Sequence, residues 1–303
     1  MSSAPPPPQE HPHVPVLRAE VLAALDPSEG KVFIDATLGA GGHSEAMLRV
    51  SGTKVIGLDQ DPSALVLASE RLLRFGARFR PVKARFSDIA SVVGDLGVER
   101  VDGILADIGV SSMQLDQAER GMSFRHDGPL DMRMDPTSGE TARELIAGLS
   151  DDELADVLFK LGEERRSRRV ARCIKQAEAA GELATTADLR RAVVRAVGPA
   201  RIGGVDPATR TFQALRIAVN REIEELEALL DAAPQVLAPG GVLAIISFHS
   251  LEDRLVKRAF KDSPAWEPLT KKPVVATDAE LARNPRARSA KLRAARLVAA
   301  ETE

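Results

Sequence analysis

The chain has 303 residues, 44% of them hydrophobic, and a formal net charge of −3. This length can bury a core for one large domain or two unequal ones, so the fold needs no external cross-link. Cys173 is the single cysteine, which excludes an intramolecular disulfide and a cysteine-based zinc cluster and fits a reducing compartment. The negative charge excludes a general affinity for nucleic acid, because such affinity comes mainly from neutralised phosphates. Any RNA binding must be local.

The first residues predict neither a leader nor a membrane anchor. Residues 1–12 are expected to form a disordered Pro-rich tail, because Pro5 to Pro8 favour polyproline II and no basic or apolar leader region is present. The longest apolar runs, such as 242–246, are far shorter than the roughly 20 residues that cross a bilayer. We therefore expect a cytoplasmic protein with no membrane span.

Residues 31–107 alternate short apolar runs with segments of helical periodicity, which predicts a parallel sheet with crossover helices. The pair Asp61-Pro62 supplies an N-cap and a first helical position. Leu65, Ala68 and Leu72 then share one face of the predicted helix. Strands are expected at 32–34, 54–58, 79–84 and 101–106, and three of them run into Asp35, Asp59 and Asp107.

The pattern changes after the fourth strand. Residues 111–139 carry turn residues without a sustained period, which indicates a long functional loop or an insertion. The segment Ser150-Asp-Asp-Glu153 matches a capping box, and roughly 140–205 is expected to be a separate helical module. Alternation then resumes with one helical face over 215–230 and a strand at 242–247, so we expect the sheet to be completed after the insertion.

The glycine loop between Asp35 and His43, Asp-Ala-Thr-Leu-Gly-Ala-Gly-Gly-His, predicts a nucleotide-like cofactor site. A backbone without side chains at the carboxyl edge of a sheet lets a ligand approach closely, although the same glycines could form only a tight turn. Asp59, at the end of the second strand, could accept hydrogen bonds from both ribose hydroxyls of an adenosine group. Dinucleotide oxidoreductases and S-adenosylmethionine methyltransferases both build this arrangement.

Two residues favour the methyl donor over NAD. The dinucleotide fingerprint needs glycine at position 44, which is Ser44. Asp35 would repel a pyrophosphate but suits the cationic amino group and sulfonium of S-adenosylmethionine. Asp107 is the first catalytic candidate, because a carboxylate there could orient an exocyclic amine and take its proton. Alternatively, Asp107 only caps a turn or binds the cofactor.

The other polar clusters are a group of histidine and acidic residues and two basic stretches. His249, Glu252 and Asp253 gather in residues 247–254, but they are nearly consecutive and lack a Gly-x-Ser-x-Gly elbow, so a hydrolase is disfavoured. The histidines lack ligand spacing, and no required metal is expected. Two basic stretches, at 165–175 and 283–296, could contact RNA phosphates; the second contains no acidic residue and is favoured.

Taken together, these segments closely resemble the bacterial small-subunit ribosomal RNA methyltransferase H family, also called MraW. Members methylate the N4 atom of a cytidine. The resemblance covers nearly the whole chain apart from the tail and residues 261–282. It rests on His13 to Leu17, Asp35 to Ser44, Asp59 to Pro62, Asp107 to Ser112, Gln114 to Asp116, Glu119 to Gly121, Phe124, Asp127 to Pro136, Gly162 to Arg165, Pro207 to Gln213, Ser247 to Arg254 and Asn284 to Ser289.

This resemblance implies an α/β fold, a Rossmann-like methyltransferase sheet with an inserted all-helical domain. The methyltransferase domain would span 13–117 and 209–303, the latter with the basic C-terminal segment, and the mostly helical substrate domain 118–208. The implied substrate is small-subunit ribosomal RNA within an assembled or assembling subunit, and the implied cofactor is S-adenosylmethionine. The implied cofactor contacts are Gly41, Gly42, His43, Asp59, Phe86, Asp107 and Gln114.

The chain departs from other amino-group methyltransferases at one point. Enzymes that methylate DNA amines usually carry Pro-Pro-aromatic after the acidic or amide residue, whereas Asp107 is followed by Ile-Gly-Val. The segment 263–281 is also shorter than expected for a member of the family. The residues are also compatible with two other functions, an NAD-dependent oxidoreductase and a non-catalytic ribosome-assembly factor that binds RNA.

Overall fold

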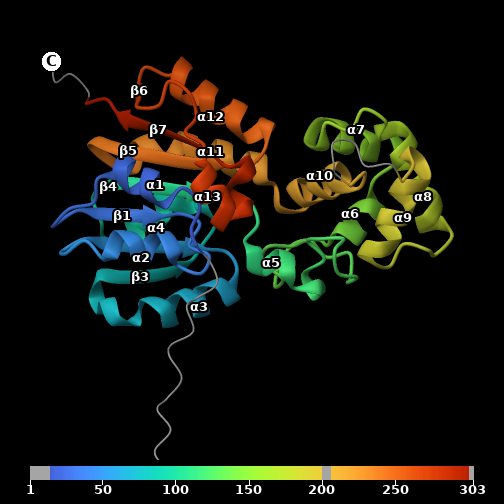
Figure 1. Ribbon diagram of the computed structural model, residues 1–303, viewed down its shortest axis with the longest axis horizontal. Helices are drawn as coiled ribbons and strands as arrows, with labels where there is room; N and C mark the ends of the chain where they lie inside the picture. The colour runs from blue at the N-terminus through green and yellow to red at the C-terminus, as the bar shows by residue number, and fades with distance from the viewer. Residues whose placement is uncertain (1–13, 200–205, 300–303) are drawn as a thin grey trace, which may run out of the picture.

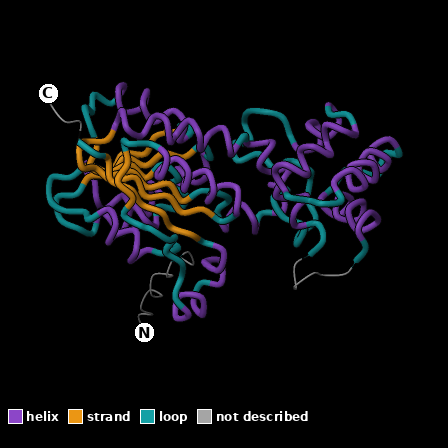
Figure 2. Tube along the Cα trace, turned by 90° about the horizontal axis from the view of Figure 1, so that it is seen from above, coloured by secondary structure: helices purple, strands orange, loops and turns teal. Residues whose placement is uncertain are grey.

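The computed structural model describes residues 14–199 and 206–299, so the predicted tail at 1–12 lies outside the described residues. Within that part the chain forms one sheet of order β3-β2-β1-β4-β5-β7-β6, in which β7 pairs antiparallel with β5 and β6 and the other pairs are parallel. Figures 1 and 2 show the sheet with helices on both faces and a helical part beside it. The strands are β1 (Val32–Asp35), β2 (Lys54–Asp59), β3 (Phe79–Lys83), β4 (Val101–Asp107), β5 (Leu237–Ser247), β6 (Trp266–Pro268) and β7 (Lys291–Leu297).

The two faces of the sheet bury different apolar sets because successive strand residues point to opposite sides. Ile34 and Ile104 belong to one core, together with side chains of α4, α11 and α12. Phe33 and Leu105 belong to the other, with side chains of α1, α2 and α3. The helices of this part are α1 (Arg18–Leu25), α2 (Gly42–Leu48), α3 (Pro62–Leu72), α4 (Ile89–Asp95), α11 (Glu222–Val236), α12 (Ser250–Asp262) and α13 (Asp278–Arg283).

The remaining helices bury a third core of their own. Its largest fully buried side chains include Met132 and Ile146. The loop after the short α5 (Ser112–Asp116) is tied to this core through Asn220, whose side chain accepts from Met134 N at 2.7 Å and donates to Met132 O at 2.7 Å. The helices are α6 (Ala142–Gly148), α7 (Asp151–Gly162), α8 (Ser167–Ala179), α9 (Thr186–Val197) and α10 (Thr209–Asn220).

Several local predictions are confirmed. Asp61 caps α3 and Pro62 is its first residue, Ser150 and Glu153 form a capping box on α7, and β3 lies within the strand expected at 79–84. The prediction of a single helical face over 215–230 is wrong, because the helix is interrupted at Arg221, between α10 and α11. Arg221 has φ 53° in the left-handed region. The turn lets Asn220 bind the loop while Arg216 pairs with Glu222 at 2.7 Å.

The basic C-terminal segment is divided by the fold. Arg293 lies in β7, is buried, and pairs with Asp253 at 2.7 Å, so it cannot reach a phosphate from this position. Arg296 pairs with Glu267 on the neighbouring strand. Arg286 and Arg288 remain exposed in the turn before β7. Among the described residues, no helix is both long and apolar enough to span a membrane.

Candidate active site

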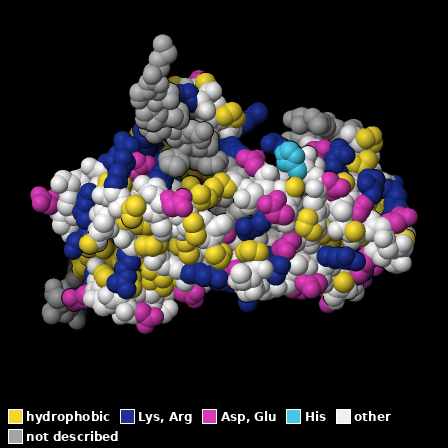
Figure 3. All heavy atoms as spheres, turned by 90° about the horizontal axis from the view of Figure 1, so that it is seen from below, with side chains coloured by type: hydrophobic (Ala, Val, Ile, Leu, Met, Phe, Trp, Pro, Cys, Tyr) yellow, Lys and Arg dark blue, Asp and Glu magenta, His cyan; other side chains and the backbone are white. Residues whose placement is uncertain are grey.

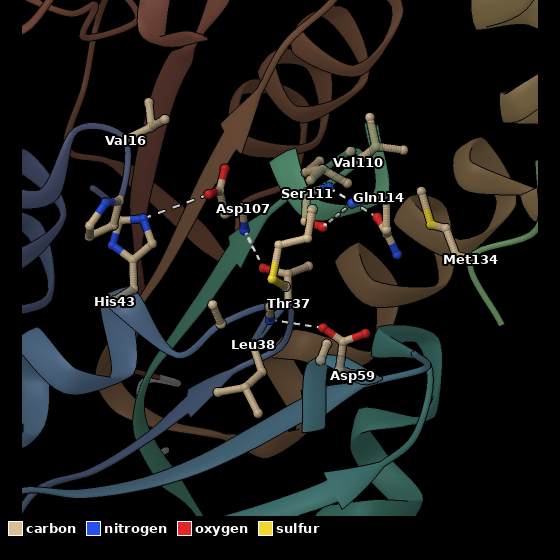
Figure 4. A pocket seen from close by; sticks show the side chains of 18 of the residues that line it. Val16, Thr37, Leu38, His43, Asp59, Asp107, Val110, Ser111, Gln114 and Met134 are labelled. Carbon is tan, nitrogen blue, oxygen red and sulfur yellow. Dashed lines mark hydrogen bonds and ion pairs between the residues drawn. The ribbon is translucent and has the colours of Figure 1, made fainter. Parts of the chain in front are cut away.

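A cavity of about 580 Å³ lies at the carboxyl ends of β1, β2 and β4. Ligands of open α/β sheets bind at this edge, and the volume falls within the roughly 300–1,000 Å³ of small-molecule sites. Figure 4 shows His43, Asp107, Thr37 and Asp59 around it, with Thr37 between the two carboxylates. The cavity therefore collects residues from the glycine loop, from two strand ends and from the loop after β4.

The glycines of the loop have two different roles. Gly39 and Gly42 line the cavity, and little surrounds a Cβ placed on Gly39. Gly41 does not line it: the residue has φ +75°, and an added Cβ would lie 3.0 Å from Leu72 Cδ1. Of the predicted cofactor contacts, Gly41 alone is turned toward the helix behind the loop, where it permits close packing on α3.

Asp35 is directed away from the cavity as well. Its side chain is buried and accepts from Ser44 Oγ at 2.7 Å, and burial raises the pKa of its carboxyl. This bond explains why position 44 holds serine where the dinucleotide fingerprint has glycine. The carboxylate stabilises the loop from behind and is not among the groups lining the cavity. A preference for a cationic ligand therefore depends on the acidic residues that do line the cavity, among them Asp59 and Asp107.

Asp59 lies at the end of β2 and faces the cavity. One carboxylate oxygen accepts from Gly39 N and the other from Asp61 N, each at 2.8 Å, so the residue holds both loops. Burial raises its pKa to about 6, against the lowering effect of these two backbone hydrogen bonds. Each oxygen keeps a further lone pair for a ribose hydroxyl.

We expect the affinity for S-adenosylmethionine to fall as the pH falls through about 6, because protonated Asp59 can no longer accept from both ribose hydroxyls. A single proton with this pKa weakens binding about tenfold between pH 7.5 and pH 5. Calorimetry across this range measures the slope, and the Asp59→Asn variant, although weaker, should show none. A slope that persists in this variant would assign the titration to another group.

Asp107 and His43 form a polar pair on the wall of the cavity. His43 Nε2 lies 3.7 Å from Asp107 Oδ2, a separation without a direct hydrogen bond (Figure 4). Both ring nitrogens of His43 and Asp107 Oδ1 are buried atoms that lack a partner in the described structure. The backbone N–H of Asp107 donates to Thr37 Oγ1 at 2.6 Å, which fixes the strand end. Buried polar atoms without partners indicate a site that a ligand completes.

Gln114 belongs to a network that the sequence did not reveal. Its side chain donates to Asp61 Oδ2 at 3.0 Å, and Arg120 donates to the same oxygen at 2.8 Å. Arg120 also donates to Met134 O at 2.6 Å. Asp61, assigned only a capping role from the sequence, thus connects β2 to the loop after β4. The network holds Gln114 and Met134 on the cavity wall.

Phe86 lines the cavity directly after β3 and packs partly against the core of the sheet. Next to it, Arg85 pairs with Glu225 of α11 at 3.0 Å, and Glu225 Oε2 is a buried atom with no hydrogen-bond partner in the part of the chain that the structure describes. Neither Arg85 nor Glu225 could be assigned to the site from the sequence, because the two are 140 positions apart and no motif joins them. The cavity also receives Asn284 and Arg286 from the C-terminal segment; Arg286 pairs with Asp116 at 3.0 Å.

Glu222, His249 and Glu252 form the group among the described residues whose ligand atoms lie close enough to hold a metal ion, within 4.8 Å of one another. Arg216 occupies both oxygens of Glu222, at 2.7 and 2.9 Å. His249 Nε2 lies 2.9 Å from Glu252 Oε1. A guanidinium at this position supplies the positive charge that a cation would bring, so we interpret the group as an ion network.

The chain matches the model of the MraW methylase family over residues 10–298. It is 67% identical to the ribosomal RNA small subunit methyltransferase H of Sorangium cellulosum, over 97% of this chain and 93% of that protein. It is 50% identical to the protein of the same name from Bradyrhizobium diazoefficiens, over 94% and 91%. The chain belongs to the MraW methylase family.

Among solved structures, the match to a ribosomal RNA methylase from Streptococcus thermophilus covers 93% of this chain and 94% of that protein's chain. Its identity of 10% and TM-score of 0.44 add nothing to the family assignment. The family, with the strand order, identifies the fold as a Rossmann-like methyltransferase sheet. Membership of the methylase family also overturns the alternative of an NAD-dependent oxidoreductase.

S-adenosylmethionine is the cofactor of this methyltransferase family, and the described residues fit it. Asp59 offers acceptors to a ribose, and Gly39 leaves space for a ligand at the loop, whereas a Cβ on Gly42 would lie 3.2 Å from Pro15 Cγ. Asp59 and Asp107 are two of the acidic residues that line the cavity, and their carboxylates favour a cationic group beside them. When bound, S-adenosylmethionine supplies a methyl group activated by its sulfonium.

Proposed function

We propose that the protein transfers a methyl group from S-adenosylmethionine to the exocyclic N4 amine of a cytidine in small-subunit (16S) ribosomal RNA. The observation that carries the chemistry is the Asp107 carboxylate, which lies on the wall of the cavity beside the glycine loop, with one oxygen that has no hydrogen-bond partner among the described residues. The close relatives named for the small ribosomal subunit support the choice of RNA. We place the reaction in the cytoplasm, on an assembled or assembling subunit.

Asp107 orients the base and removes the proton. The cytosine amine is a weak nucleophile because its lone pair is delocalised into the ring, so an acceptor must hold one N–H while the nitrogen approaches the methyl group. The nitrogen forms the new N–C bond, and the sulfur keeps the electron pair of the broken S–C bond. The Asp107 carboxylate takes the proton that the amine loses. Fixed placement of both reactants contributes roughly 7–11 kcal/mol toward the barrier.

We assign cofactor binding to the residues that line the cavity, with Gly41 as support for the loop. Asp59 binds the ribose, Phe86 borders the adenine, and His43 and Asp107 lie at the methionine end. Gln114 closes the wall between these ends. The proposed set is Gly41, Gly42, His43, Asp59, Phe86, Asp107 and Gln114.

RNA contact is assigned to the inserted helical region, 118–208, and to the exposed part of the basic C-terminal segment. Arg165, Arg169 and Arg172 are exposed at the start of α8 and before it, and Arg286 lies on the cavity wall. On the face drawn in Figure 3, basic side chains are interleaved with acidic ones over both parts of the molecule. This distribution favours a few local phosphate contacts.

A strain that lacks the protein provides the test. Small-subunit RNA from this strain, digested to nucleosides and measured by mass spectrometry, should lose an N4-methylated cytidine that returns with the wild-type gene. Unchanged N4-methylcytidine would contradict the proposed substrate. A protein that binds the subunit but transfers no methyl group would instead be the non-catalytic assembly factor.

A further inference from the structure

We propose that Phe248 is the stacking platform for the target cytosine and replaces the aromatic residue that is missing after Asp107. This inference rests on the proposed function and concerns the same cavity. The Pro-Pro-aromatic sequence of DNA amine methyltransferases would place its aromatic at position 110, which is Val110. A valine cannot offer a flat face to a base, so another element must do so if the base is stacked.

Among the residues that the structure describes, two phenylalanines line the cavity, and they follow strands on opposite sides of it. Phe86 follows β3, beside the proposed ribose ligand Asp59. Phe248 follows β5, on the other side of Asp107. The strand order β2-β1-β4-β5 separates the ends of β2 and β5 by three strand steps, roughly 14 Å at about 4.8 Å each. One adenine cannot contact both rings, so Phe248 is available to a second ligand.

The β5 end places this ring beside the proposed proton acceptor. Asp107 pairs in register with Ile246, two residues before Phe248, and the backbone N–H of Ile108 donates to Ile246 O at 2.9 Å. Gly109 has φ +109°, and a Cβ placed there would lie 3.6 Å from Phe248 Cδ2. Without that side chain, the ring and the Asp107 carboxylate border the same space. A base on this ring could direct its amine toward Asp107.

The ion network described above fixes the backbone that carries the ring. Glu252 is 1% exposed, and its Oε2 accepts from Phe248 N at 2.9 Å and from His249 N at 3.3 Å. Burial opposes ionisation of Glu252, but the nearby His249 and the backbone hydrogen bonds lower its pKa. A charged acceptor buried behind a partly exposed ring is a rigid support, as a stacking site requires.

The stacking role predicts a specific loss in the Phe248→Leu variant. Base stacking on an aromatic ring corresponds to about 10- to 100-fold in binding, so methyl transfer at limiting small subunit should fall by that factor. The affinity for S-adenosylmethionine should remain at the wild-type value. Phe248→Trp keeps a flat face and should retain most of the activity, which a purely structural role would not predict.

Phe86→Leu is the matched control, because the same change at the other end of the cavity should weaken S-adenosylmethionine binding. Full transfer by Phe248→Leu, or equal loss of cofactor affinity in both leucine variants, would overturn the inference. In Phe248→Trp, stacking should quench the added indole emission when small subunits bind, while Trp266 stays buried against Phe260 as a constant background. Unchanged emission on binding would also overturn it. An inactive wild type would contradict the proposed function instead.

Discussion

The Asp107→Asn variant is expected to transfer methyl groups about 10²- to 10⁴-fold more slowly than the wild type, the range that a positioned acid or base contributes. The amide keeps one acceptor oxygen for the N–H of the base but cannot take the proton. It also preserves the shape of the strand end, because the backbone N–H of Asp107 still donates to Thr37 Oγ1. Single-turnover transfer from labelled cofactor measures the step.

The control must separate this effect from a change of charge. Asp95, an exposed acid at the end of α4, gives the matched Asp95→Asn variant, which should transfer at the wild-type rate. Affinity for S-adenosylmethionine should change by less than about tenfold in Asp107→Asn, since the amide retains an acceptor. Wild-type transfer by this variant would remove Asp107 from its role, and loss of cofactor binding alone would restrict it to a cofactor contact.

The second large effect concerns stability. Replacing Arg120 with methionine is expected to lower the free energy of unfolding by about 3–5 kcal/mol, the cost of leaving one partner of a buried ion pair alone. Arg120 is 8% exposed and joins Asp61 to the carbonyls of Arg133 and Met134. The variant should therefore also release the loop that carries Met134 on the cavity wall. Urea unfolding without ligand measures the change.

Lys160 supplies the control for this prediction, because its pair with Asp156 joins two exposed side chains on α7. Lys160→Met should unfold at the wild-type urea concentration. Equal stability of both methionine variants would show that Gln114 and Ser63, which also donate to Asp61, are sufficient partners for its carboxylate. In that case the loop would not depend on Arg120.

The parts of the site that follow strand ends could be predicted from the sequence. Asp59 and Asp107 come directly after apolar runs, and parallel strands bring such positions to one edge. The glycine loop was also visible as a motif. The different roles of the residues within the loop were not visible in the sequence. Gly41 faces α3 and Asp35 faces Ser44, and these directions depend on how the loop packs in the folded chain.

The remaining residues depend on contacts that no local pattern encodes. Arg85 meets Glu225 across 140 positions, and Arg120 meets Asp61 across 59. The break at Arg221 was hidden because the apolar period continues through it from α10 into α11. A residue with a left-handed backbone conformation can separate two helices without interrupting the apolar period of the sequence. Only the tertiary partners of its neighbours explain it.

We propose that the protein methylates the N4 amine of a cytidine at this cavity. Purified protein, small ribosomal subunits from a strain lacking it and isotopically labelled S-adenosylmethionine provide the most direct measurement, followed by nucleoside analysis of the RNA. We expect the label in N4-methylcytidine with the wild type and its loss with Asp107→Asn. Label in another nucleoside, or none in the RNA with active cofactor, would contradict it.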